Sequence, residues 1–182
     1  MKTRDLIICA VFAAILCVFS VMTIPIGVIP ISMGVFGVIL TSCILGWKKG
    51  TISVIVYILI GVIGLPIFSG FKGGIAVLAG PTGGYIWSYI LMALFIGFFT
   101  AKLPQNKPLA VAKLSVISFI GVVICYLFGT MQFMLVAHKT FMQAVTVCVY
   151  PFIPFDIIKS VAGGVIAYGV RYALVKTKLL TV

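Results

Sequence analysis

The chain has 182 residues, of which 63% are hydrophobic and 8% are charged, and its mean hydropathy is +1.35. Soluble domains carry about 45–50% apolar and roughly 25% charged residues, so this composition excludes a soluble domain and predicts an integral membrane protein. The formal net charge of +11 does not indicate nucleic-acid binding, because the cations lie in short clusters between apolar runs, as topology signals do. We therefore expect the lipid bilayer, and no nucleic acid, as the partner of these cations.

Six apolar runs predict an all-α fold, a polytopic six-transmembrane-helix bundle, and the length leaves room for a single membrane domain, residues 1–182. The predicted helices cover residues 6–24, 31–46, 51–67, 84–101, 112–131 and 157–175. The first run has a basic start like that of a signal peptide, but it continues to Ile24 without an A-x-A cleavage site, so we predict a retained helix. The second run gives about 24 Å of helix against a hydrocarbon core of about 30 Å, so neighbouring helices must shelter it.

The basic residues predict that the N- and C-termini are both cytoplasmic. Most of them precede the first helix, connect the second helix to the third or the fourth to the fifth, or end the chain: Lys2, Arg4, Lys48, Lys49, Lys102, Lys107, Lys113, Arg171, Lys176 and Lys178. Lys72, Lys139 and Lys159 remain for the outer side. Because cytoplasmic loops carry an excess of Lys and Arg, the larger group marks the cytoplasmic side.

Two outer segments do not have the composition of ordinary solvated connections. The first, Gly64–Tyr85, reads GLPIFSGFKGGIAVLAGPTGGY, and its glycines permit turns and close approach to a ligand, so we predict a ligand loop over residues 68–83. The second, residues 132–155, contains Thr140-x-x-Gln143, a capping-box pattern that predicts a short helix. The chain has no internal repeat, which disfavours a self-sufficient carrier built from inverted repeats.

The start of the last predicted helix carries the main candidate site, Asp156 and Lys159 in YPFIPFDIIKS. Ionisable side chains at membrane depth are costly and mark functional sites by default. Three structural explanations compete with ligand binding: Asp156 caps its own helix, the two residues only pair with each other, or Lys159 extends to the outer surface. As a ligand site, Asp156 would accept hydrogen bonds from ligand N–H groups, while Lys159 and the helix N-terminus would favour a ligand anion.

Further candidates surround this pair. Tyr85 and Gln132 are additional polar ligand-binding candidates. Aromatic residues of the outer segments would form the apolar wall of a pocket, since ligand sites are mostly apolar with few polar anchors: Phe68, Phe71, Tyr85, Phe152 and Phe155.

The pairing of GLPIFSGFKGGIAVLAGPTGGY with VYPFIPFDIIKS, on a six-helix chain of this length, resembles the BioY family, the biotin-binding substrate (S) components of energy-coupling factor (ECF) transporters. The resemblance implies high-affinity capture of biotin at the outer face of a bacterial plasma membrane. It also implies partners, one transmembrane coupling subunit and two ATP-binding subunits. The implied ligand-binding residues are Asp156, Lys159 and the loop from Gly73 to Tyr85, which includes Gly74 and Gly84.

The first predicted helix carries a face of small residues, Ala10-x-x-x-Ala14 with Ala13 beside it. Small residues allow close helix approach. In substrate components such a face resembles the docking surface for the coupling subunit, and internal packing is an equal alternative.

An enzyme is disfavoured because the chain has only two acidic residues, Asp5 and Asp156, and one histidine, His138. The sequence contains no G-x-S-x-G, H-E-x-x-H or Walker A motif, and its five cysteines form no C-x-x-C pattern, so we expect no catalytic residues, no cofactor and no metal. Two transport alternatives stay open. One is a stand-alone carrier driven by a gradient through Asp156, and the other is an S component for another vitamin, such as thiamine or riboflavin.

Overall fold

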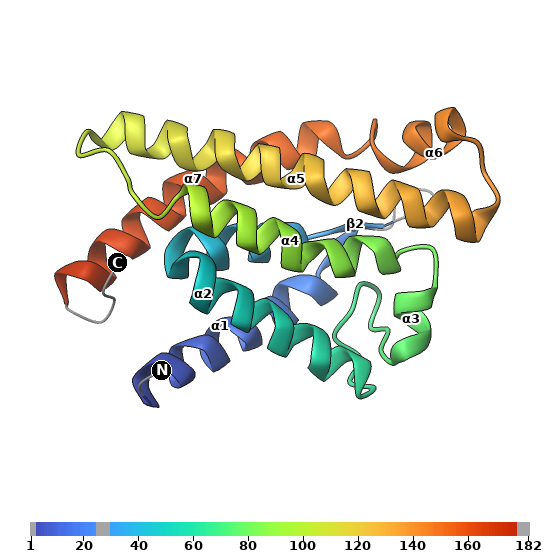
Figure 1. The fold of residues 1–182 in the computed structure, drawn as a ribbon, viewed down its shortest axis with the longest axis horizontal. Helices are drawn as coiled ribbons and strands as arrows, with labels where there is room; N and C mark the ends of the chain where they lie inside the picture. Colours follow the sequence, from blue (N-terminus) through green and yellow to red (C-terminus); the bar gives the residue numbers. More distant parts are fainter. Residues whose placement is uncertain (1–2, 25–29, 178–182) are drawn as a thin grey trace.

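The structure is a computed structural model that describes residues 3–24 and 30–177. Lys2 and Lys178, two of the cations used to predict the orientation, lie outside these residues. The described elements are α1 (Thr3–Val21), β1 (Thr23–Ile24), β2 (Ile31–Ser32), α2 (Gly34–Val62), α3 (Ile75–Ala79), α4 (Gly83–Phe99), α5 (Lys107–Ala137), α6 (Phe141–Cys148) and α7 (Ile153–Lys176). Figure 1 shows the N and C ends of the chain at one end of the molecule and the short helices α3 and α6 at the other.

The predicted helical membrane class is confirmed. Helices α1, α2, α5 and α7 are each long and apolar enough to cross a bilayer, and the apolar helix α4 has 17 residues. Helices suit such sequences because lipid offers no partner to the backbone, so every N–H and C=O must bond within the segment. Helix α2 packs against α1, α4 and α7, and α5 packs against α4 and α7, so the buried core lies among these helices.

The predicted count of six helices is not confirmed, because the described residues form seven. The short helices α3 and α6 lie in the predicted ligand loop and outer segment, and the predicted helices 31–46 and 51–67 together form α2. Helix α2 bends at Gly46, where φ is 75° and ψ is −177°, a conformation that glycine adopts without a steric cost. Gly97 of α4 packs directly on the backbone of Trp47 beside this bend, where a Cβ atom would overlap it.

Most other boundaries agree with the prediction to within a few residues. Helix α5 is longer than predicted at both ends, and α7 begins at Ile153 rather than at residue 157. The predicted capping box is confirmed, since the backbone N–H of Thr140 donates to Oε1 of Gln143 at 3.2 Å at the start of α6.

Arg171 is a buried cation near the end of α7 that the sequence identified only as a topology signal. Its guanidinium donates to the main-chain oxygens of Cys43 (3.2 Å), Thr100 (2.7 Å) and Ala101 (2.7 Å). These carbonyls lie close to the Gly46 bend in α2 and at the C-terminal end of α4, where carbonyl groups lack partners within the helix and favour a cation. Arg171 therefore joins α2, α4 and α7 at the end of the molecule that carries the termini.

Candidate functional site

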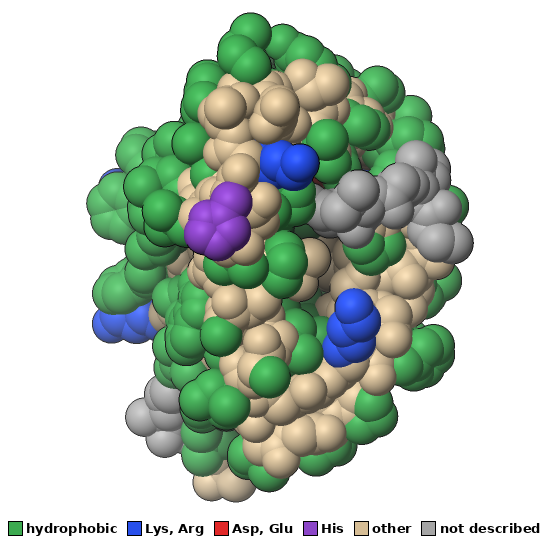
Figure 2. Space-filling view, turned by 90° about the vertical axis from the view of Figure 1, so that its right-hand side faces the viewer, with side chains coloured by type: hydrophobic (Ala, Val, Ile, Leu, Met, Phe, Trp, Pro, Cys, Tyr) green, Lys and Arg blue, Asp and Glu red, His purple; other side chains and the backbone are tan. Residues whose placement is uncertain are grey.

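A cavity opens at the end of the molecule that carries α3 and α6, and Figure 2 shows the surface hollowed on this side. Ligand sites usually have apolar walls and a few polar groups. The lining combines apolar and hydroxyl-bearing residues with one charged pair: Ser20, Pro30, Ser32, Val35, Tyr57, Phe68, Ser69, Val77, Thr82, Tyr85, Ile86, Tyr89, Cys125, Tyr126, Phe152, Asp156 and Lys159.

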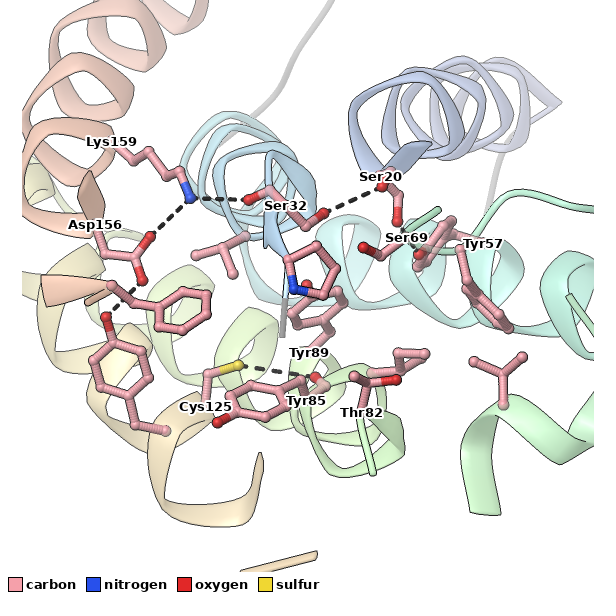
Figure 3. Close-up of a pocket in the computed structure, with 17 residues that line it drawn as sticks. Ser20, Ser32, Tyr57, Ser69, Thr82, Tyr85, Tyr89, Cys125, Asp156 and Lys159 are labelled. Atoms are coloured by element: carbon pink, nitrogen blue, oxygen red, sulfur yellow. Dashed lines mark hydrogen bonds and ion pairs between the residues drawn. The ribbon is translucent and has the colours of Figure 1, made fainter. Parts of the chain in front are cut away.

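The charged pair is buried at one side of this cavity (Figure 3). Lys159 Nζ lies 2.9 Å from Oδ1 of Asp156, and the two residues are 7% and 1% exposed, respectively. Lys159 therefore does not extend to the outer surface. Asp156 does not cap α7 either, because the N-cap is Phe152 and the backbone N–H of Asp156 already donates to the Phe152 carbonyl at 2.9 Å. The i, i+3 pairing that was one alternative to ligand binding is present.

Two further partners complete the pair, and the sequence analysis missed both. The Tyr126 hydroxyl, from the middle of α5, donates to Oδ2 of Asp156 at 2.6 Å. Lys159 Nζ donates to the main-chain oxygen of Ser32 in β2 at 2.8 Å. Tyrosine is common at the membrane interface, whereas Tyr126 lies in the middle of an apolar run. This unusual position could have identified Tyr126 from the sequence. No local pattern pointed to Ser32.

A second polar group lies across the cavity from the ion pair (Figure 3). The hydroxyls of Ser20 and Tyr57 are 2.5 Å apart, and Ser69 and Thr82 lie on the same side. The buried Oγ of Ser69 has no hydrogen-bond partner among the described residues. This side of the cavity thus has hydroxyl groups but no charge.

Tyr85 and Phe152 line the cavity as predicted, together with Phe68, whereas Phe71 and Phe155 are not among the lining residues. The hydroxyl of Tyr85 donates to the main-chain oxygen of Cys148 at 3.4 Å, which ties α4 to the end of α6.

Gln132 does not line the cavity. Its Nε2 donates to the main-chain oxygens of Leu78 (2.7 Å) and Gly80 (2.8 Å), so the side chain holds the α3 segment against α5. In this position Gln132 shapes the wall of the cavity from behind.

The three candidate glycines are not among the lining residues either. Gly73 packs directly on the main-chain oxygen of Leu65, and Gly74 adopts a φ of 90°. Gly84 lies so close to α5 that an added Cβ would be 2.6 Å from the main-chain oxygen of Phe128. These glycines allow the loop to fold tightly and α4 to approach α5.

The alanines of α1 divide between two faces. Ala13 is buried at 1% exposure, whereas Ala10 and Ala14 are exposed together with apolar neighbours on the same face, Ile7, Val11 and Val18. The predicted face of small residues therefore has one member that packs inside the molecule.

The chemistry that this arrangement supports follows from its charge. The pair has no net charge, and it places a carboxylate acceptor beside an ammonium donor in an apolar wall. Such a site fits a neutral group that carries N–H donors next to a carbonyl, with an apolar remainder. Within the described residues, no three His, Cys, Asp or Glu side chains lie together as metal ligands would.

Comparisons with known proteins agree with one another. The model of the BioY family matches residues 1–176. The "Biotin transporter BioY" of Thermotoga maritima is 38% identical over 164 residues, which cover 90% of this chain and 94% of the relative. The "Probable biotin transporter BioY" of Pyrococcus horikoshii is 38% identical over 167 residues, covering 92% and 96%. A crystal structure described as the S-component for biotin from an ECF-type ABC transporter has a TM-score of 0.86 at 29% identity, covering 94% of this chain and 95% of that chain.

Replacing one member of the ion pair should destabilise the fold more than replacing both. Asp156→Leu leaves the Lys159 ammonium buried without an anion, so we expect a loss of roughly 3–5 kcal/mol of unfolding free energy. The double variant Asp156→Leu/Lys159→Met should recover most of this loss. Thermal unfolding in detergent measures the difference, and Lys176→Met, at an exposed lysine of the same helix, is the control. A double variant no more stable than the single one would contradict the prediction.

Proposed function

The chain belongs to the BioY family, and from this premise we propose that it is the biotin-binding S component of an ECF-type transporter, a multi-pass protein of the cell membrane. It captures biotin in the cavity and delivers it inward together with an ATP-driven energising module. The names of its relatives and the family match over nearly the whole chain support transport. The observation that carries the choice of ligand site is the buried Asp156–Lys159 pair on the wall of the cavity.

The ureido ring of biotin suits the ion pair. This ring has two N–H donors and one carbonyl, and it is uncharged. Asp156 accepts from an N–H group, and Lys159 donates to the carbonyl with the one ammonium hydrogen that neither Asp156 nor Ser32 takes. Phe68, Tyr85 and Phe152 then cover the fused rings and the aliphatic chain.

The carboxylate of biotin lies at the far side of the cavity in this arrangement. Asp156 and Lys159 are neighbours on one helix face, about 5–6 Å apart at Cβ, whereas extended biotin is longer, so the pair serves one end of the ligand. The hydroxyls of Ser69 and Thr82 lie opposite, and the free Oγ of Ser69 is an available donor.

We further propose that the halves of α2 on either side of Gly46 cross the membrane separately, which gives six crossings and cytoplasmic termini. The left-handed φ of Gly46 and the position of both termini at one end of Figure 1 support this topology. The distribution of charge also supports it, because Lys48 and Lys49 follow the Gly46 bend of α2 and Lys102 lies between α4 and α5, on the side of the termini.

The exposed face of α1 is the proposed docking surface for the transmembrane coupling subunit. Ala10 and Ala14 leave a shallow strip between larger apolar side chains, and a helix of the partner can approach closely along such a strip. Ala13 is buried inside the molecule and is therefore not part of the proposed docking surface.

Biotin binding tests the proposed site. Asp156→Asn replaces one acceptor oxygen by a donor, and Lys159→Ala removes the ammonium, so each should weaken binding about 10- to 100-fold, since hydrogen bonds to charged groups contribute about 1.5–3 kcal/mol. Isothermal titration of the folded, detergent-solubilised protein gives the dissociation constants. Lys139→Ala, at an exposed lysine of the same end of the molecule, is the matched control. If both site variants bind within about twofold of the unmodified chain, the ion pair has a structural role only.

Docking is tested at α1. Ala10→Trp or Ala14→Trp should abolish biotin uptake with the energising module, because the indole fills the strip, while biotin binding by the isolated chain is retained. Uptake by vesicles and titration of the same preparations measure the two properties. Ala112→Trp, at an exposed alanine of α5, is the control. Loss of biotin binding in the α1 variants would assign this face to the fold instead.

The topology is tested by labelling from outside the cell. After the five native cysteines are replaced, Lys139→Cys should react with a membrane-impermeant maleimide in intact cells. Lys102→Cys should react only after the membrane is permeabilised. The reverse pattern would place the termini outside.

A further inference from the structure

Helix α1 contributes to both surfaces that the proposed function uses. Its inner face reaches the cavity through Ser20, which is buried, and its outer face exposes Ala10 and Ala14. Because α1 packs mainly against α2, the links at its two ends fix its orientation. At the N-terminal end, Asp5 pairs with Lys49 at 2.7 Å.

A chain of hydrogen bonds joins the C-terminal end of α1 to the ion pair (Figure 3). Lys159 Nζ donates to the main-chain oxygen of Ser32 (2.8 Å), and Ser32 Oγ donates to the main-chain oxygen of Ser20 (3.2 Å). The hydroxyl of Ser20 continues the chain to the hydroxyl of Tyr57 (2.5 Å). The four residues belong to α7, β2, α1 and α2, and all of them line the cavity.

Main-chain bonds reinforce the link between β2 and α1. Thr23 pairs with Ser32 in the antiparallel β1–β2 ladder, and the backbone N–H of Met33 donates to the Met22 carbonyl at 3.0 Å. The last carbonyls of a helix lack partners within the helix, and Ser32 Oγ provides one for the Ser20 carbonyl. A displacement of Ser32 therefore moves the end of α1 with it.

We propose that α1 couples the occupancy of the cavity to its outer face, with Ser32 and Ser20 as the positioning residues. This proposal rests on the proposed function. A ligand that accepts the third ammonium hydrogen of Lys159 reorients the same ammonium that donates to Ser32, so the position of β2, and with it the orientation of α1, depends on the ligand. Such coupling is reciprocal: biotin changes the affinity for the energising module, and the module changes the affinity for biotin by the same factor.

Two variants at different links of the chain of hydrogen bonds test the coupling. Ser32→Ala removes the bond from Ser32 Oγ to the Ser20 carbonyl, and Tyr57→Phe removes the hydroxyl contact between α2 and α1. The experiment measures the dissociation constant of the complete energising module for the chain in nanodiscs, with and without saturating biotin. The ratio of the two constants should be about fivefold or more in the unmodified chain, as is typical of allosteric coupling, and within about twofold of one in either variant. Both side chains border the cavity, so biotin affinity is expected to fall as well and is titrated separately.

The control is Ser42→Ala, because the buried Oγ of Ser42 bonds to the Val38 carbonyl within α2, outside the chain of hydrogen bonds. This variant should keep the ratio of the unmodified chain. A ratio of one in the unmodified chain, or an undiminished ratio in both Ser32→Ala and Tyr57→Phe, overturns the proposal.

Hydrogen exchange gives a test that does not depend on any variant. The backbone amides at the C-terminal end of α1 should exchange more slowly when biotin is bound to the unmodified chain, and unchanged exchange overturns the coupling. If the unmodified chain does not bind biotin at all, the proposed function fails rather than the coupling alone.

Discussion

The buried ion pair between Asp156 and Lys159 is the constraint around which the cavity is built. Removing two charges from water costs several kcal/mol per ion, and the mutual attraction of the charges offsets this only when further hydrogen bonds satisfy them. Tyr126 of α5 supplies such a bond to the carboxylate, and Ser32 of β2 accepts one from the ammonium. Satisfying the pair therefore fixes α5, α7 and β2 relative to one another, on the wall of the space that a ligand would fill.

The same pair explains how an apolar cavity can select a polar group that carries no net charge. A lone carboxylate or ammonium would favour ligands of opposite charge, whereas the pair presents an acceptor and a donor together. A cyclic urea matches both at once, and hydrocarbon rings match the aromatic walls. The hydroxyl groups of the opposite side can then meet the polar end of a long ligand without a third charged side chain.

Sequence reasoning succeeded where the physical cause was local. Hydropathy predicted the helical class, and the i, i+3 spacing of Asp156 and Lys159 placed them on one helix face, where the structure shows them paired. It failed where the cause was distant in the chain, because Ser32 is 127 residues from Lys159 and no periodicity links them. The end predicted for the second helix at residue 46 coincides with Gly46, whose non-helical backbone divides α2 into two halves. Gln132 carried an ambiguous signal: a polar side chain in an outer segment can contact a ligand or, as here, hold loop carbonyls.

Burial of a charge does not by itself identify a site in this chain, and Arg171 shows why. It is buried at 6% exposure, comparable to Lys159, yet its partners are main-chain carbonyls near the bend of α2 and the end of α4, and it is not among the residues that line the cavity. Its position is explained by the unpaired carbonyls of helix ends, which a cation stabilises. The ion pair has no such explanation, because Lys159 is the seventh residue of α7 and lies away from either end of that helix. A charge that only completes helix ends is explained by the fold, whereas a buried pair that borders an open space supports the ligand role proposed for it.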